Sequence, residues 1–362
     1  MIMTGLRGVG KTVLLNRFAE LAEMAGWESI ELEASKHDET AFRQSIFSKF
    51  RAALLHISPR RRWSERARHA AEVLSSFVLS IDQSGTFSVT WDVDPSEGYG
   101  DHGDLGLDLT DVFLAVGEVA KEKGTGIVLL IDEVQFLTTV QLESLIQAVH
   151  KSVQKKLPIT FVGAGLPQIA ELAGDAKSYA ERLFKFPRID SLTPEEARQA
   201  LVGPAETENV SYDEDAVDLA VSLTHGYPYF IQELGYQAWI VASGNHITAE
   251  DISTANDAYE AKLDGSFFRV RLDRATPLQT AYMRAMAELG SEPQKAADVA
   301  SLMKRESSQV APIRSQLIDM GLLYTPQHGY AAFTVPDFDK FMMRAVPRLE
   351  VPEIQHRRRR KK

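Results

Sequence analysis

The sequence predicts an α/β protein with a parallel β-sheet core, followed by a helical lid domain and a C-terminal winged helix. Three observations support this prediction. The chain begins with a short apolar strand at residues 2–4, a glycine-rich loop and a helical pattern. Residues 127–131 form an unbroken apolar run, typical of a central strand buried on both faces. From residue 192 onward capped helices replace the strands, and three short helices and a strand pair close the chain.

The glycine-rich loop at residues 5–12 reads GLRGVGKT and fits the pattern G-x-x-x-x-G-K-[ST]. Glycines allow main-chain N–H groups to converge on phosphate oxygens, and the N-terminus of the following helix adds partial positive charge. Lys11 supplies a positive charge to the β- and γ-phosphates, and the Thr12 hydroxyl is a ligand for Mg²⁺. The predicted nucleotide-binding residues are Gly5, Gly8, Val9, Gly10, Lys11, Thr12 and Val13.

The first domain is expected to span residues 1–190. Its sequence pattern predicts a helix over 13–26, a half-buried strand over 27–33, helices over 39–56 and 107–123, and a β-hairpin insertion at about 74–94. A phosphate-binding loop needs a strand before it, and this strand lies right at Met1. We therefore expect either that the natural chain starts further upstream or that the adenine pocket is unusually open.

Two acids follow the apolar run, and they are the second candidate catalytic feature. Side chains at the carboxyl end of a parallel strand lie at the sheet edge where ligands bind. Asp132 is therefore expected in the Mg²⁺ shell, while Glu133 orients or deprotonates the attacking water.

The rest of the first domain continues the alternation of helix and strand. A helix over 141–153 leads to an apolar strand over 159–165, which implies a parallel sheet. Arg182 stands just before the last expected strand of this domain.

The second half of the chain is predicted to contain two more domains and a tail. Thr193 and Glu196 fit a capping box at the start of a helical lid over residues 191–265. Residues 266–346 are predicted to form the winged helix, with helices over 279–289, 295–303 and 309–320 and a hairpin after residue 320. Residues 347–362 form a basic tail.

Together these motifs resemble the AAA+ and STAND-type P-loop ATPases, in the domain order of the bacterial and archaeal origin initiators. The resemblance implies that Lys11 and Thr12 contact phosphate and Mg²⁺, that Asp132 is the second Mg²⁺ ligand and that Glu133 is the catalytic base. It also implies that Arg182 is an arginine finger that reaches a neighbour in a homo-oligomer; the alternative is a surface pair with Glu181 or Asp175.

The lid carries a further family element. Residues 226–228 read GYP and resemble the G-x-P element with which STAND lids touch the nucleotide, which makes Pro228 the expected contact. The alternative is an ordinary turn at the start of a helix.

Two departures from the family pattern predict slow turnover. The polar sensor expected at the end of the third strand is replaced by Gly-Ala-Gly at residues 163–165, and no arginine lies near Pro228 in the sequence. A slowly hydrolysing ATP switch therefore fits better than a motor.

Composition limits the remaining function classes. The chain has no cysteine, which excludes disulfides and thiolate sites and favours the cytoplasm. No stretch is apolar enough to span a membrane, and Met1 leads directly into the phosphate-binding loop without a signal peptide. The net charge of −10 predicts no broad basic surface, although residues 357–362 read RRRRKK. This run either contacts phosphate backbones or an acidic partner, or is a solvated tail.

The sequence leaves three functional hypotheses open. The first is an ATP-binding and ATP-hydrolysing switch that uses Mg²⁺. The second is a DNA-binding, initiator-like regulator in which nucleotide is mainly structural. Its winged helix would bind duplex DNA through Gln309, Arg314 and Gln316 and through the nearby Lys304 and Arg305. The third is a signalling scaffold that oligomerises with ATP and binds a protein partner through the winged helix.

Overall fold

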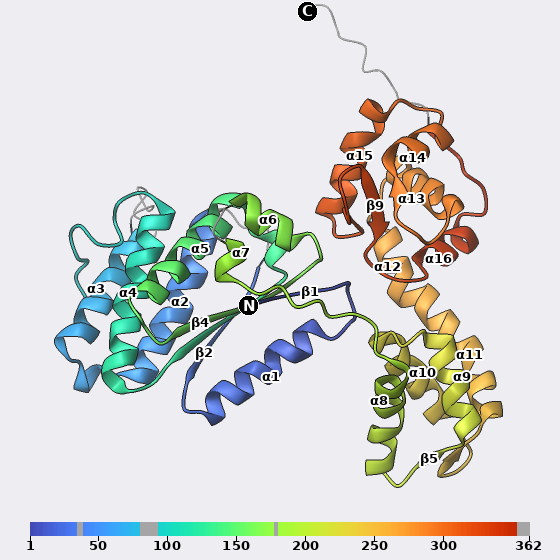
Figure 1. Cartoon of the computed structure of the whole chain (residues 1–362), viewed down its shortest axis with the longest axis horizontal. Coiled ribbons are helices and arrows are strands. Elements are labelled where there is room, and N and C mark those ends of the chain that lie inside the picture. The colour runs from blue at the N-terminus through green and yellow to red at the C-terminus, as the bar shows by residue number, and fades with distance from the viewer. Residues whose placement is uncertain (35–38, 80–92, 177–179, 353–362) are drawn as a thin grey trace, which may run out of the picture. The chain divides into compact units, whose positions relative to one another are not determined.

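The computed structural model describes residues 1–34, 39–79, 93–176 and 180–352. The chain divides into two compact units, coloured along the chain in Figure 1. The first unit contains residues 1–5 and 10–189, and the second contains residues 6–9 and everything from residue 190 onward. Four residues of the glycine-rich loop thus group with the second unit.

A four-stranded parallel sheet forms the centre of the first unit. Its strands are β1 (Ile2–Thr4), β2 (Glu28–Glu33), β3 (Ile127–Asp132) and β4 (Ile159–Gly165). Their order is β1-β4-β3-β2, and every neighbouring pair is parallel. Thr4 is in register with Gly165, and Glu33 with Asp132. The loop after β1 and the acids after β3 therefore lie at the same edge of the sheet.

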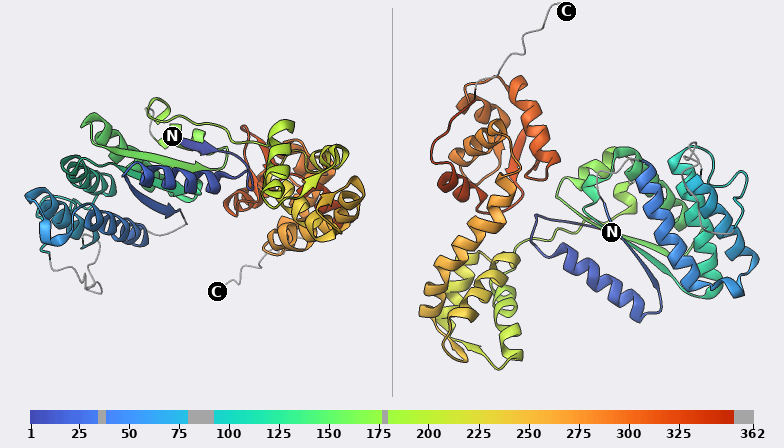
Figure 2. Two further views of the ribbon diagram at one scale, coloured as in Figure 1. Left: turned by 90° about the horizontal axis from the view of Figure 1, so that it is seen from below. Right: turned by 180° about the vertical axis from the view of Figure 1, so that it is seen from behind.

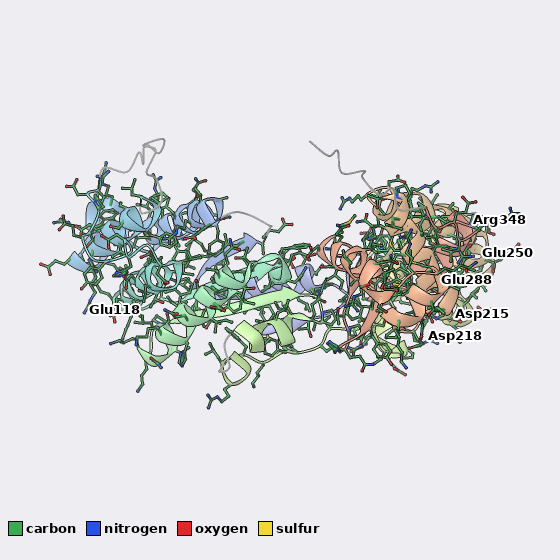
Figure 3. All side chains as sticks on the ribbon, turned by 90° about the horizontal axis from the view of Figure 1, so that it is seen from above. Glu118, Asp215, Asp218, Glu250, Glu288 and Arg348 are labelled. Carbon is green, nitrogen blue, oxygen red and sulfur yellow. The ribbon has the colours of Figure 1, made fainter. Side chains whose placement is uncertain are left out.

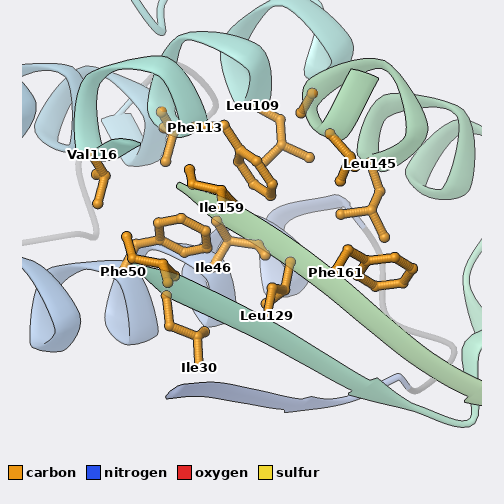
Figure 4. Packing of buried hydrophobic residues seen from close by; sticks show 14 of the residues in the cluster. Ile30, Ile46, Phe50, Leu109, Phe113, Val116, Leu129, Leu145, Ile159 and Phe161 are labelled. Carbon is orange, nitrogen blue, oxygen red and sulfur yellow. The ribbon is translucent and has the colours of Figure 1, made fainter. Parts of the chain in front are cut away.

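Helices cover both faces of the sheet, as the apolar sequence of β3 requires. Leu129 and Ile131 belong to the larger core cluster, which Figure 4 shows packed beneath the helices of one face. Val128 and Leu130 point the other way and pack with Leu15 of the first helix. Figure 2 shows the sheet and its helices from two further sides.

The helices of the first unit occupy most of its sequence. They are α1 (Lys11–Met24), α2 (Glu39–Ile57), α3 (Glu65–Leu79), α4 (Leu105–Lys123), α5 (Thr139–Gln154), α6 (Ile169–Ala176) and α7 (Ala180–Leu183), with 3₁₀ turns at Arg60–Arg62 and Val134–Phe136. Among the described residues, no helix is long and apolar enough to cross a membrane.

The prediction of a β-hairpin at about 74–94 is wrong for its first strand. Residues up to Leu79 belong to α3, and the remainder, residues 80–92, lies outside the described part of the chain. Val73, Leu74, Phe77 and Val78 are buried because they recur at helical spacing and form one face of α3. Residues 77–81 taken alone fit a strand pattern, because the helical spacing becomes visible only when Val73 and Leu74 are included.

A buried ion pair links two helices of this layer. Arg43 on α2 and Asp108 on α4 are both almost completely buried, and Arg43 Nη1 lies 2.8 Å from Asp108 Oδ2. The backbone N–H of His102 donates a hydrogen bond of 2.8 Å to the other oxygen of Asp108. Arg43 also donates to the exposed Glu39, at 2.9 Å.

The second unit begins with the helical lid. Its helices are α8 (Pro194–Thr207), α9 (Glu214–Thr224), α10 (Pro228–Val241) and α11 (Ala249–Lys262), and β5 (Ser211–Tyr212) pairs with β6 (His246–Ile247). The predicted capping box of α8 is present, since Thr193 and Glu196 each bond the other's backbone N–H.

The lid continues into the C-terminal part without a linker. A π-helical turn (Leu263–Phe268) joins α11 to α12 (Arg269–Leu272), so the boundary predicted after residue 265 falls inside a run of helix. The three predicted helices are α13 (Pro277–Leu289), α14 (Ala296–Leu302) and α15 (Ser307–Asp319). An antiparallel sheet of β7 (Gln294–Lys295), β9 (Tyr330–Phe333) and β8 (Leu323–Tyr324) accompanies them, followed by α16 (Phe338–Ala345).

Replacement of Asp108 by Ala should destabilise the first unit strongly, because it removes the buried carboxylate that pairs with the buried Arg43 charge. We expect a loss of about 3–5 kcal/mol in the free energy of unfolding, measured by urea denaturation followed by circular dichroism. The control is Glu39→Ala, which removes the exposed partner of the same arginine and should cost less than about 1 kcal/mol. Equal losses for the two variants would contradict this account of the ion pair.

Candidate functional site

The loop at residues 5–12 joins β1 to α1 and has the backbone geometry of a phosphate cradle. Gly8 and Gly10 have φ of +86° and +92°, a region that side chains other than glycine rarely adopt. Gly10 is the N-cap of α1, and its carbonyl accepts the N–H of Leu14 at 3.0 Å. Because the first N–H groups of an α-helix have no acceptor within the helix, the N-terminus of α1 favours an anion at this loop.

Lys11 is folded back into the loop. Its ammonium donates a hydrogen bond of 2.9 Å to the carbonyl of Gly5, and its side chain is only 8% exposed. The two valines of the predicted set differ, because Val9 is buried whereas Val13 is 70% exposed. Any contact of Val9 with phosphate therefore comes from its backbone.

Thr12 and Asp132 meet although 119 residues separate them in the sequence. The Thr12 hydroxyl donates to Asp132 Oδ2 at 2.5 Å, and the backbone N–H of Glu133 donates to Asp132 Oδ1 at 2.7 Å. A hydroxyl and a carboxylate are oxygen ligands of the kind that Mg²⁺ prefers. The described residues contain no cluster of three or more acidic, histidine or cysteine ligands. A bound Mg²⁺ would thus need phosphate or water oxygens to complete its shell.

A cavity of about 350 Å³ opens beside these residues in the first unit. Thr12, Asp132 and Glu133 line it together with the acids Glu31 and Glu33 of β2. The cavity therefore lies at the sheet edge where ligands of open α/β folds bind.

Glu133 adopts a left-handed backbone conformation, with φ of +52°, and its carboxylate is held by a neighbour. Gln135 donates from Nε2 to Glu133 Oε2, and its Oε1 accepts the N–H of Leu166 at 3.0 Å. Gln135 thus connects the candidate catalytic base to the end of β4. Sequence analysis missed Gln135, although it stands only two residues after Glu133.

This arrangement also explains why small residues end β4. A Cβ atom on Gly165 would lie 2.8 Å from Gln135 Oε1, so a larger residue would displace the Gln135 side chain. The Gly-Ala-Gly sequence at the end of β4 makes room for a polar side chain from the 3₁₀ turn after β3.

Arg182 lies on the short helix α7, with an exposed side chain. The segment after it runs beside β1, where Ile2 N–H donates to Lys185 O at 2.8 Å and Thr4 N–H to Pro187 O at 2.9 Å. The expected last strand is thus an extended segment with one isolated bridge, between Thr4 and Arg188. The role of Arg182 as a finger stays a prediction.

Residues 6–9 form their contacts within the second unit. The carbonyl of Gly8 accepts the N–H of Tyr229 at 3.2 Å, and Arg7 N–H donates to the carbonyl of Thr334 at 3.2 Å. A Cβ atom on Gly8 would lie 3.0 Å from the Tyr227 hydroxyl. Pro228 begins α10 between these two tyrosines. The predicted GYP element therefore meets the loop, and Pro228 as a nucleotide contact stays a prediction.

A basic side chain from a distant part of the sequence reaches the same region. Burial, and then the positive charge of Arg7, lower the pKa of Arg271 on α12. Arg271 also interacts with Tyr227, whose pKa is raised by burial. Sequence analysis missed Arg271 because it lies 43 residues after Pro228 and belongs to no motif. Its guanidinium stacks on Phe267, 4.1 Å from the ring centroid.

Comparisons with known proteins agree with this geometry for the first unit. Residues 1–170 match the family model of the AAA domain, and residues 265–342 match a family described as a domain of unknown function. No curated protein matches the chain significantly. The AAA match confirms the resemblance to AAA+ ATPases that the two motifs indicated.

Solved structures match nearly the whole chain at low sequence identity. The Walker-type ATPase paby2304 of Pyrococcus abyssi is 16% identical with a TM-score of 0.58, and the match covers 94% of this chain and 90% of that one. Cdc6p of Pyrobaculum aerophilum is 15% identical with a TM-score of 0.43, covering 96% and 88%. The RuvB Holliday junction branch migration motor of Thermotoga maritima is 13% identical with a TM-score of 0.44, covering 97% and 87%. The similarity to the first of these concerns the fold.

Replacement of Gly8 by Ala should destabilise the protein more than replacement of Gly10. Both positions have positive φ, which costs an alanine roughly 1–2 kcal/mol. A Cβ on Gly8 also meets Tyr227 and Tyr229, whereas a Cβ on Gly10 meets nothing within 4 Å. Thermal unfolding of the two variants measures the difference. Equal midpoints would show that the tyrosines do not pack on Gly8.

Proposed function

We propose that this chain, whose residues 1–170 match the family model of the AAA domain, is an ATP-dependent molecular switch that binds ATP with Mg²⁺ and hydrolyses it slowly. The observation that carries the proposal is the hydrogen bond between Thr12 and Asp132. It unites the phosphate-binding loop with the acid after the central strand, in the arrangement that phosphoryl transfer to water requires.

Each residue of the site has a role in this proposal. Lys11 would leave the carbonyl of Gly5 and pair with the β- and γ-phosphates, while Thr12 and Asp132 would hold Mg²⁺. When bound, Mg²⁺ neutralises negative charge on the phosphate oxygens. Glu133 orients the attacking water and accepts its proton.

Slow turnover follows from the hydrogen bond that Gln135 donates to Glu133. Glu133 must exchange Gln135 for water before it can accept a proton. We therefore place Gln135 as a positioning residue that holds the base until nucleotide rearranges the site.

The switch itself would act through residues 6–9. The backbone of Arg7 and Gly8 bonds to Thr334 and Tyr229 in the second unit. Phosphates that reorganise the loop would strengthen or break these two bonds, so the second unit would respond to nucleotide. We further propose that Arg182 completes the site of a neighbouring subunit as an arginine finger.

The DNA-binding alternative has less support from the side chains of α15. Gln309 accepts the N–H of Glu306 at 3.1 Å, and Gln316 accepts from Gln279 at 3.0 Å. Both glutamines expected to contact DNA are thus engaged within the protein, and so is Arg305, which donates to the carbonyl of Pro352. Arg314 and Lys304 are left as the main candidates. A protein partner for this part of the chain remains the other alternative.

Replacement of Lys11 by Ala should abolish nucleotide binding, because it removes the positive charge that faces the phosphates. We expect the Kd for ATP, measured by calorimetry in the presence of Mg²⁺, to rise by at least about 100-fold, as for the loss of a buried charged contact. The matched control is Lys121→Ala on α4, an exposed lysine that should leave the Kd unchanged. Unchanged affinity in Lys11→Ala would overturn the nucleotide site itself.

Replacement of Glu133 by Gln should leave ATP binding intact while lowering steady-state hydrolysis by about 10²–10⁴-fold, the usual contribution of a general base. The companion variant Gln135→Ala removes the hydrogen bond to the Glu133 carboxylate and should raise the rate of ATP hydrolysis. Hydrolysis at the wild-type rate by Glu133→Gln would remove Glu133 from the mechanism.

The same assay, repeated with duplex DNA at low salt, separates the alternatives. If duplex DNA raises the rate of ATP hydrolysis and Arg314→Ala removes this increase, the DNA-binding, initiator-like hypothesis is favoured. Turnover indifferent to DNA would favour a protein partner.

A further inference from the structure

The lid carries an apolar groove whose lining contains none of the residues predicted to bind nucleotide. It lies between α8 and α10 and has a volume of about 380 Å³. Small side chains from the two helices form much of its lining, among them Ala200, Ala205 and Gly235. Gly235 keeps the helices close, since a Cβ there would lie 3.0 Å from Leu201 Cδ1.

Two large aromatic side chains border the groove and are exposed. Tyr236 is 61% exposed and Trp239 is 45% exposed, and both lie on α10. The fold of the lid does not bury them, although the adjacent Ile231 and Leu234 are buried in its core. Tyrosine and tryptophan are enriched among the residues that contribute most to protein interfaces.

The lid around this groove is strongly acidic. Residues 191–265 contain fourteen aspartates and glutamates but only two lysines and arginines. One of those two, Arg198, is already paired with Glu214 and Asp218. Glu208 lines the groove itself. Figure 3 labels Asp215, Asp218 and Glu250 among the acidic side chains of this unit. A partner for the groove should therefore be basic.

The chain itself contains a strongly basic segment. We propose that the groove binds the C-terminal segment of this chain, residues 353–362, in which RRRRKK follows Ile354. Arginine guanidinium groups stack on tyrosine and tryptophan rings, and the acidic lid complements their charge. The described chain ends at Pro352, so the segment falls outside the described residues. This proposal is independent of ATP hydrolysis.

The test uses the full-length chain with its six terminal arginines and lysines replaced by Gln, which leaves the groove open. A fluorescently labelled peptide of residues 353–362 is titrated with this protein, and anisotropy gives the Kd. We expect saturable binding that weakens as salt is raised, since exposed charges are screened. Trp239→Ala should weaken it by about tenfold or more, as for a central interface aromatic. Glu208→Gln should weaken it by a smaller factor.

Matched controls come from the same lid. Ile240→Ala removes an exposed side chain next to Trp239 that does not line the groove, and Glu250→Gln removes an acid from α11. Neither should change the Kd more than about twofold. Tyr236→Ala provides a second groove variant if Trp239→Ala fails to fold by circular dichroism. Absence of peptide binding, or equal effects of the groove and control variants, would overturn the proposal.

Discussion

The hydrogen bond between Thr12 and Asp132 depends on the parallel sheet. Strands β1 and β3 are not neighbours, because β4 lies between them. Their carboxyl ends nevertheless meet at one edge, since every neighbouring pair in the sheet is parallel and in register. The helices on both faces bury β3 and fix its position, which explains why residues 127–131 are all apolar. The candidate site therefore requires the whole core to be folded, and no single segment could form it.

The side chain of Gln135 supplies the polar contacts at the end of β4. Strand β4 ends in Gly-Ala-Gly and offers no polar group of its own. Gln135 reaches across from the turn after β3 and bonds both Glu133 and the N–H of Leu166. The absence of a Cβ on Gly165 is what admits it. The small residues that end β4 thus leave the space that the Gln135 side chain fills.

Local patterns predicted much of this molecule. The glycine-rich loop, the apolar strand with its acids and the capping box of α8 each depend on residues close in sequence. Three features could not be predicted in this way. The start of the expected hairpin is part of α3, because its apolar residues follow a helical period that begins earlier, at Val73. Gln135 and Arg271 owe their positions to tertiary contacts, as does the grouping of residues 6–9 with the second unit. The roles of Arg182 and Pro228 stay predictions.

The grouping of residues 6–9 with the second unit has a consequence for the evolution of the chain. The polypeptide passes from one unit to the other three times, after residues 5, 9 and 189. Neither unit is therefore a continuous stretch of gene. A recombination event at residue 190 would transfer the lid and the C-terminal helices without the four loop residues that they contact. Such a transfer would leave Tyr229 and Thr334 without their bonds to the loop. Selection should therefore keep the two halves on one polypeptide, so that they diverge together.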